Sequence, residues 1–513
     1  MDFALLLVFV LPILSVPFVY FAGKKSPKIS ALIVALVAVI NIGLVLTTIP
    51  TVLNSPSHSY VEPYNWIPVL NQTQFTLFVD GISASIAITS LVLIVAAALF
   101  SVNYMEGKKN LPVYYALLSL LSVGLVGVFI TSNLLLFYFC WELMLVPAYF
   151  IVGGWGYRES YRAAFKLFIF THAGAVFVLL GIGAIYFYTG TTDMFAAQSA
   201  LLSIAPDLVK WIIIALTAGF MVKMAIVPVH MWLPDAHSEA PATMSALLSG
   251  VIISAGAYAI IRLSFGVVFP AVGEAFGITF LHALTIFGVV SAFFGSLIAL
   301  VETDIKRIIA YSSIAHMGYV MFGISLFPVA LARGETVALA SAAIAVTGTI
   351  LHLISHAVSK GLFFLSAGSV MHQTEQRDVN EMGGLAGKMP FTAVTSTMAA
   401  LSIAGTPPFA CFFSEAFIFV GAFEIVASDS FYLLPTVLML VATVLSLAYS
   451  LRFISKVFLG QQKVTAESVK KLISDVPLYM KLAMGILAVL VVLIGIYPTL
   501  FTTLIETVTF GHA

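Results

Sequence analysis

Residues 208–228 read LVKWIIIALTAGFMVKMAIVP. A helix needs about 20 mostly apolar residues to cross the hydrocarbon core of a bilayer, and this run supplies them. Two features interrupt it. Lys223 places an amino group inside the run, and Pro228 removes a backbone donor at its end. We therefore interpret the run as a membrane-spanning helix that carries a buried charge and ends in a break.

Apolar runs of similar length recur along the chain and predict about fourteen spans in total. The others lie near residues 3–22, 29–49, 79–101, 113–131, 133–153, 164–188, 243–264, 279–300, 304–325, 337–371, 392–425, 431–455 and 481–507. The runs 337–371 and 392–425 exceed the length of a straight crossing, so we expect each to form a broken or two-part helix. Of the 513 residues 61% are hydrophobic and 9% charged, against roughly one quarter charged in soluble domains. The predicted fold class is an all-α polytopic membrane protein.

Net charge and cysteine usage narrow the possible ligands. The formal net charge is zero, so nothing indicates nucleic acid as a partner. Cys140 and Cys411 lie in apolar runs, and the sequence has no CxxC motif, Cys/His cluster or dinucleotide fingerprint. We expect this chain to bind no cofactor. Because Asp2 stands where a secretory signal would carry basic residues, the first apolar run reads as a retained span.

Basic residues predict the orientation of the spans, because cytoplasmic loops carry an excess of Lys and Arg. If both termini lie outside the cell, eighteen of the 23 basic residues fall in inside loops. The remaining five are Lys210, Arg262 and Arg333 in outside loops, with Lys223 and Lys360 within spans. A missed or invented span would exchange the sides of all later loops and remove this asymmetry.

Four ionisable groups lie within the predicted spans, namely Glu142, Lys223, Lys360 and Glu415. On insertion scales each costs about 2.5–3.5 kcal/mol at a helix centre, so four unpaired groups cost on the order of 10–14 kcal/mol. Because this is comparable with the stability of a whole domain, the groups must be paired or hydrated. They could be ion pairs that only hold the bundle together. We favour a chain of proton-exchanging groups, because intramembrane charges usually mark ion paths.

Two histidines lie in the same predicted span as Lys360 and add to the ionisable groups within the membrane. His352, His356 and Lys360 are spaced i, i+4, i+8 and therefore share one helix face. Neutral imidazole accepts a proton on one nitrogen and releases one from the other, which suits a relay. The alternative is a zinc site, but a protonated lysine is a poor ligand and no carboxylate lies nearby in sequence. We predict a relay and no metal. His172 and His282, alone in their spans, are interpreted as packing residues.

Helix breakers accompany two of the charged groups. Pro228 follows Lys223 by five residues, and Pro407-Pro408 precede Glu415 by seven. At membrane depth, backbone groups freed by a break are tolerated only against protein or water. Paired discontinuous helices in two halves of a chain are typical of transporter ion sites, so the two breaks favour an ion path.

Several ordered motifs carry a family resemblance. The longest is KMAIVPVHMWLPDAHSEAP at residues 223–241, accompanied by WELM at 141–144, DIKRIIAYSS at 304–313 and GTPPF at 405–409. With VDGIS at 79–83, they cover nearly the whole chain. The sequence resembles the antiporter-like subunits of complex I. These share their fold with membrane subunits of group 4 membrane-bound hydrogenases, of the coenzyme F420-linked dehydrogenase and of Mrp sodium/proton antiporters.

The resemblance implies two inverted five-helix repeats with broken helices 7 and 12. It divides the chain into four parts. Helices 1–3 occupy residues 1–110, and the first repeat, helices 4–8, occupies 111–266. The second repeat, helices 9–13, occupies 267–460, and a surface segment with helix 14 occupies 461–513.

The resemblance also implies roles for the buried groups. Glu142 matches the fifth-helix glutamate that pairs with the seventh-helix lysine, here Lys223. Glu415 matches the terminal ionisable group of the family's ion path, on helix 12. Glutamate at that position is typical of subunit M, and so is a chain that stops after span 14. Ser254 stands near the position of an eighth-helix lysine or histidine in relatives, so the relay crosses that gap through water or along the His352 face. The predicted ion path comprises Glu142, Lys223, His230, His237, His352, His356, Lys360 and Glu415.

The implied function is ion translocation, with H⁺ as the expected ion, by a non-redox subunit of a redox-driven, complex I-like oxidoreductase. Redox energy would change the separation of Glu142 and Lys223, and the proton would pass through Lys360 and the histidines to Glu415. Implied partners are other antiporter-like and small membrane subunits and a peripheral arm with iron–sulfur clusters, in a bacterial or archaeal cell membrane. One alternative is a subunit of an Mrp-type Na⁺/H⁺ antiporter without redox partners. The other is a scaffold that conducts no ions.

Overall fold

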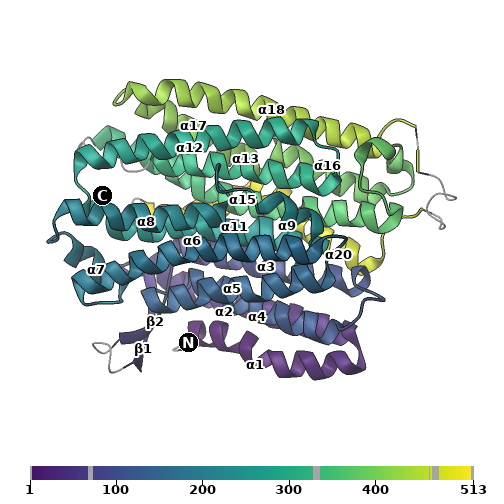
Figure 1. The fold of residues 1–513 in the computed structure, drawn as a ribbon, viewed down its shortest axis with the longest axis horizontal. Coiled ribbons are helices and arrows are strands. Elements are labelled where there is room, and N and C mark those ends of the chain that lie inside the picture. The colour runs from purple at the N-terminus through teal and green to yellow at the C-terminus, as the bar shows by residue number, and fades with distance from the viewer. Residues whose placement is uncertain (1–2, 68–72, 327–335, 462, 465–472, 510–513) are drawn as a thin grey trace.

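The computed structural model describes residues 3–67, 73–326, 336–461, 463–464 and 473–509. Its long helices run side by side along one direction and form a bundle (Figure 1). Arg333 and part of the surface segment predicted after residue 461 lie outside the described residues.

In the described part of the chain, twelve helices are long and apolar enough to cross a membrane. They are α1 (Ala4–Lys25), α2 (Pro27–Asn54), α3 (Gly81–Tyr104), α4 (Leu111–Phe129), α5 (Leu134–Trp155), α6 (Ser160–Thr189), a composite helix at 242–271, α12 (Glu274–Val301), α13 (Ile305–Ser325), α15 (Thr336–Thr374), α18 (Leu433–Phe458) and α20 (Leu478–Ile496). The composite helix joins α10 (Ala242–Leu247), η1 (Leu248–Ile252), α11 (Ile253–Ala259), η2 (Ile260–Val268) and η3 (Phe269–Ala271).

The other two predicted spans, 208–228 and 392–425, are broken. They contain α8 (Pro206–Met224) in the first case, and α16 (Pro390–Ile403) and α17 (Cys411–Ile425) in the second. The remaining short helices are α7 (Met194–Leu201), α9 (Leu233–Glu239), η4 (Val379–Glu381), η5 (Leu385–Gly387), η6 (Ser430–Tyr432) and α21 (Thr499–Thr509). The predicted fold class, with breaks in helices 7 and 12, is confirmed. The four-part division of the chain stays a prediction.

The expectation that residues 337–371 form a broken helix is wrong. The run lies in α15, one continuous helix of 39 residues. At 1.5 Å per residue it is about 58 Å long, nearly twice the ~30 Å hydrocarbon core, so it tilts or extends beyond the core. No proline occurs between residues 336 and 374, so nothing removes a backbone donor from the helix.

A β-hairpin forms between α2 and α3, in the polar stretch that separates the predicted spans 29–49 and 79–101. Strand β1 (Ser59–Ile67) pairs antiparallel with β2 (Thr73–Asp80). Glu62 on β1 is buried and accepts hydrogen bonds from the backbone N–H groups of Leu5 and Leu6, both 3.0 Å away. The hairpin therefore delivers a carboxylate to the positive N-terminus of α1, which fixes that helix end.

Burial increases toward the centre of the bundle. The composite helix, α13 and α15 are each 94% buried over their apolar windows, whereas α18 is 33% and α1 39% buried. Figure 1 places α11, α13 and α15 in the middle of the bundle. Outer helices expose large apolar side chains such as Phe18, Phe187 and Leu434, as expected for contact with lipid.

An ion-pair network ties the two halves together at one end of the bundle. Lys166 on α6 and Arg307 on α13 both contact Asp235 on α9, at 2.6 and 2.9 Å. Arg377, which follows α15, contacts Glu239 on α9 at 3.1 Å and Asp304 before α13 at 2.7 Å. The network therefore joins the sequence motifs 223–241 and 304–313, and it anchors α9 to the second half.

Arg377 holds a charge at the centre of this network. Burial alone would lower the pKa of its guanidinium, but the charges of Asp304 and Glu239 and their hydrogen bonds outweigh burial and raise the pKa. The group therefore stays positive at any pH the protein meets, and it also donates to the backbone oxygen of Ser238.

Replacing Arg377 with alanine is expected to destabilise the protein by about 3 kcal/mol, because two largely buried carboxylates would lose their partner. Thermal unfolding of the purified chain in detergent measures the effect. Arg162→Ala is the matched control, because its ion pair with Glu159 is exposed on both sides and contributes little. Equal unfolding temperatures for the two variants would contradict a stabilising role for the network.

Candidate functional site

The first break lies between α8 and α9, and side chains form hydrogen bonds with the backbone groups that it frees. Ala225 caps α8 in the left-handed conformation with φ 57°, and Val227-Pro228 is a cis peptide. The indole Nε1 of Trp232 donates to the oxygen of Val222 at 2.9 Å, and Ser291 Oγ accepts from the N–H of Val227 at 3.0 Å. Backbone groups freed by the break are thus satisfied within the protein, as the apolar surroundings require.

Lys223 lies in the last turn of α8 and is 2% exposed. Its Nζ lies 3.5 Å from the backbone oxygen of Trp141 and 4.6 Å from the centre of the indole ring. Among the described residues, the ion pairs within 4.0 Å include none between Lys223 and Glu142. The lysine is held by a carbonyl dipole and an aromatic face, both of which stabilise a cation less than a carboxylate would.

Glu142 pairs with a different residue from the one the family resemblance implies. Its Oε2 lies 3.2 Å from Nδ1 of His172 on α6, while its Oε1 is buried without a hydrogen-bond partner in the protein. The His172 side chain is 49% exposed and that of Glu142 is 24% exposed, so the pair lies at a lateral face of the bundle. His172, interpreted from sequence as a packing residue, is therefore a partner of the Glu142 carboxylate.

The second break, between α16 and α17, holds a carboxylate against a glycine. Gly405 has φ +64°, and a Cβ added to it would collide with the carboxylate of Glu415. Glycine is therefore required both for the backbone conformation and for the close approach of Glu415. Pro407-Pro408 is a cis peptide, as is the X–Pro bond in the first break.

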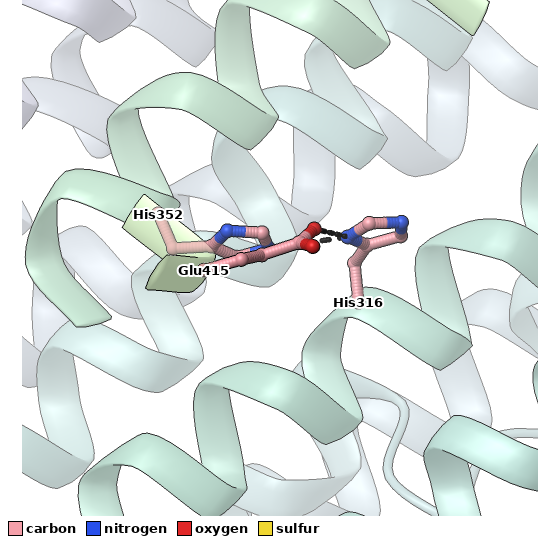
Figure 2. Close-up of side chains that lie close together, drawn as sticks. All are labelled: His316, His352 and Glu415. Atoms are coloured by element: carbon pink, nitrogen blue, oxygen red, sulfur yellow. Dashed lines mark hydrogen bonds and ion pairs between the residues drawn. The ribbon is translucent and has the colours of Figure 1, made fainter. Parts of the chain in front are cut away.

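Histidines from two helices meet Glu415 beside this break. His316 on α13 has its Nδ1 3.1 Å from Nε2 of His352 on α15 and 4.0 Å from Oε1 of Glu415 on α17. All three residues are buried. Figure 2 shows the Glu415 carboxylate and the His352 ring both directed at the His316 ring. We call these three residues the His–His–Glu cluster.

His356 and Lys360 continue from this cluster along α15. The His356 ring centre lies 5.7 Å from that of His316, and neither of its nitrogens has a hydrogen-bond partner in the protein. Lys360 Nζ donates to the hydroxyl of Ser312 and lies 3.4 Å from the oxygen of Ile309. The predicted shared face of His352, His356 and Lys360 is thus directed at α13.

His237 lies between the two halves. It is fully buried on α9, its ring stacks on Phe364 of α15 at 4.7 Å, and neither ring nitrogen has a partner in the protein. His230 lies within the first break, half buried, with its ring 4.7 Å from that of Phe294. Of the two motif histidines, His237 therefore reaches the helix that carries Lys360.

Ser254, near the position of the eighth-helix lysine or histidine in relatives, makes no hydrogen bond between the two halves within the described part of the chain. Its hydroxyl donates to the oxygen of Gly250 on its own helix at 3.0 Å. A different serine crosses between the halves, because Ser249 Oγ lies 2.8 Å from Ser313 Oγ on α13. Ser313 follows Ser312, the hydrogen-bond partner of Lys360.

A cavity of about 640 Å³ opens at the end of the bundle opposite the ion-pair network. It lies between β2, α7, η2 and α21, and Arg262 and Asp80 on its wall form an ion pair at 2.5 Å. Arg262, assigned from sequence to an outside loop, is instead largely buried within the composite helix. A small second pocket shares Ile261, Phe265 and Val346 with the cavity and reaches Thr349, one turn before His352.

Sequence reasoning missed several residues of this site. His316 was not singled out, although it is the centre of the His–His–Glu cluster. Ser312, Ser414 and Tyr449 supply hydroxyl partners to Lys360, His352 and His316. Single hydroxyls and a lone histidine in apolar helices carry no sequence signal of their own, so only tertiary contacts identify them.

A bundle of membrane-spanning helices, two of them broken beside buried lysines and carboxylates, defines the class of antiporter-like membrane subunits. The family described as NADH:quinone oxidoreductase/Mrp antiporter, TM, matches residues 131–446, and the chain belongs to this family. NADH-quinone oxidoreductase subunit M of Rickettsia conorii is 30% identical over 503 residues, which cover 95% of this chain and 94% of that protein. The chain is thus a complex I-type antiporter-like integral membrane subunit.

Solved structures share the fold. A chain of the membrane-bound sulfane sulfur reductase, an archaeal respiratory membrane complex, matches with TM-score 0.82 and 26% identity, covering 96% of this chain and 76% of that one. A chain of respiratory complex I from Thermus thermophilus matches with TM-score 0.82 and 20% identity over 99% of both chains. A chain of the Mrp complex from Dietzia matches with TM-score 0.81 and 21% identity, covering 100% and 99%.

Proposed function

We propose that this chain translocates protons across a bacterial or archaeal cell membrane as one subunit of a redox-driven, complex I-like respiratory complex. The observation that carries the proposal is a series of titratable groups on helices from both halves, all of them buried except the partly buried Glu142. It begins at Glu142 and Lys223, continues through His237 and Lys360, and ends at the His–His–Glu cluster. Intramembrane groups of this kind are expensive and mark ion paths by default.

The input end of the path is the lateral face where Glu142 and His172 lie. Both side chains are partly exposed in the single chain, so an adjoining subunit can contact them directly. Moving Glu142 from His172 toward Lys223 would exchange a His–Glu pair for a Lys–Glu pair. Because an opposite charge within ~4–6 Å favours the charged form of a group, that motion changes the proton affinity of Lys223.

The middle of the path crosses from the first half to the second. His237 and the Ser249–Ser313 pair are the polar groups that support this crossing. The unpartnered nitrogens of His237 and His356 suit water-mediated transfer, since buried polar groups without protein partners commonly bind ordered water. Lys360 then exchanges its proton with the histidines on α13 and α15.

The exit is at the cavity lined by Arg262 and Asp80. The excess of Lys and Arg in the opposite loops supports an orientation in which this end of the bundle and both termini lie outside the cell. Thr349 and the small pocket lie between the cavity and His352, so the release path is short. Moving one charge against about 150 mV costs roughly 3.5 kcal/mol, within the range that pairing and burial of titratable groups can supply.

The chain's partners are inferred from its relatives. NADH-quinone oxidoreductase subunit M and the sulfane sulfur reductase chain are parts of multi-subunit complexes, as is the Mrp chain. We infer other antiporter-like and small membrane subunits, together with a peripheral arm that carries iron–sulfur clusters. The Mrp-type exchanger, which has no redox arm, is the second candidate.

Purification of the chain from native membranes in mild detergent separates these candidates. Iron–sulfur or nickel-bearing subunits that copurify in fixed proportion would support the redox-driven complex and identify its electron donor. If the stoichiometric partners are antiporter subunits alone, the redox part of the proposal is wrong and the chain is a Na⁺/H⁺ exchanger subunit.

A further inference from the structure

The His–His–Glu cluster has the composition and spacing of a metal site. One ring nitrogen each of His316 and His352 and a carboxylate oxygen of Glu415 lie within 4.8 Å of one another, and each residue comes from a different helix. Two Zn–N bonds of about 2.0–2.1 Å at a tetrahedral angle put their nitrogens about 3.4 Å apart. The observed separation is 3.1 Å, so the imidazoles need only a small adjustment.

The outward-facing nitrogens of the two histidines are already held. His352 Nδ1 lies 2.9 Å from Ser414 Oγ, and His316 Nε2 lies 3.3 Å from the hydroxyl of Tyr449. Metal-binding histidines nearly always have their second nitrogen fixed in this way, which sets the ring orientation and the tautomer. The inward-facing nitrogens and the carboxylate of Glu415 therefore converge on one point (Figure 2).

We infer that this cluster binds one Zn²⁺ ion with His316, His352 and Glu415 as ligands and a water molecule in the fourth position. Imidazole nitrogens suit zinc, whereas Mg²⁺ and Ca²⁺ prefer oxygen ligands. Zn²⁺ takes the place of the hydrogen shared between His316 Nδ1 and His352 Nε2, and that hydrogen moves to the outward nitrogen of the same ring, so two neutral imidazoles bind the ion as neutral ligands. Occupancy removes both imidazoles from the relay and makes Zn²⁺ an inhibitor of translocation.

Charge sets the affinity of the site. Zn²⁺ with one carboxylate leaves a net positive charge, and the amino group of Lys360 lies nearby, since its partner Ser312 is one turn from His316. Whenever Lys360 is protonated, it adds a second positive charge. A like charge in a low-dielectric interior opposes cation binding. Lys360→Gln is therefore expected to bind Zn²⁺ more tightly than the unmodified chain.

Binding is measured on the full chain in detergent without turnover, so the result does not depend on the proposed ion translocation. After incubation with ZnCl₂ and gel filtration, elemental analysis is expected to give one Zn²⁺ per chain, and X-ray absorption only nitrogen and oxygen ligands. His316→Gln and His352→Gln are expected to lose this ion. Ser414→Ala, which removes only the support of His352, weakens binding by about tenfold.

The control variant is His282→Gln, which alters a histidine that also contacts a carboxylate, Asp429 at 2.9 Å, away from the cluster. It is expected to keep the ion. The inference is overturned if the unmodified chain binds no Zn²⁺, or if the ion persists in both His316→Gln and His352→Gln. Should either glutamine variant fail to fold, Ser414→Ala and Lys360→Gln decide, because the inference requires their affinities to change in opposite directions.

Discussion

The variant Lys223→Ala is expected to lower the rate of coupled proton uptake by about tenfold or more. Positioned acid–base groups typically contribute 10²–10⁴-fold to proton transfer, and Lys223 is the buried base at the end of α8. Alanine cannot exchange a proton, and the contact with Trp141 is lost with the amino group. Proton uptake by vesicles that contain the native complex, followed with a pH-sensitive dye, measures the effect.

Lys210→Ala is the matched control for this experiment. Lys210 lies on the same helix but pairs with exposed Asp207 at 2.6 Å in the first turn. Removing it leaves the buried groups unchanged, so normal proton uptake is expected. Equal uptake by Lys223→Ala and Lys210→Ala would show that protons do not pass through Lys223.

The variant Glu415→Gln is expected to reduce proton release to a similar extent, about tenfold or more, because an amide has no proton to exchange. Glutamine keeps the volume of the side chain in the close contact with Gly405, so the second break is retained. Electron transfer and proton uptake are measured together on the same vesicles. The expected result is a lower ratio of protons to electrons.

Glu424→Gln provides the comparison on the same helix. Glu424 lies nine residues after Glu415 on α17 and is exposed. The complex with Glu424→Gln is expected to show the same ratio of protons to electrons as the unmodified complex. A normal ratio for Glu415→Gln as well would exclude Glu415 from the path.

The sequence predicts the membrane-spanning architecture well, because each span obeys a local rule. A run of apolar residues must be helical in lipid, and proline weakens a helix, so breaks at Pro228 and Pro407 could be expected from sequence. Proline alone does not decide the break, because Pro17 in α1 and Pro147 in α5 lie inside continuous helices. Length alone misled the interpretation of α15, since a helix can tilt or extend beyond the membrane instead of breaking. The β-hairpin was missed because Glu62 reads as a loop residue until its partners on α1 are known.

The site is harder to predict because its contacts join distant parts of the chain. Glu415 is 63 residues from His352 in sequence, so the argument that no carboxylate lies near the histidines failed in three dimensions. His316 approaches His352 only because α13 packs against α15. His172 contacts Glu142, an interaction that neither the residue pattern nor the family resemblance indicated.

Protons are expected to move through this subunit when its complex transfers electrons. The most direct test measures the pH and Na⁺ content inside sealed vesicles while an electron donor is supplied, with Na⁺ present and then absent. The compartment on the outer side of the subunit is expected to become acidic in both conditions. This acidification is expected to be lost in Lys223→Ala. Accumulation of Na⁺ with acidification only when Na⁺ is present, or acidification that is unchanged in Lys223→Ala, would contradict this expectation.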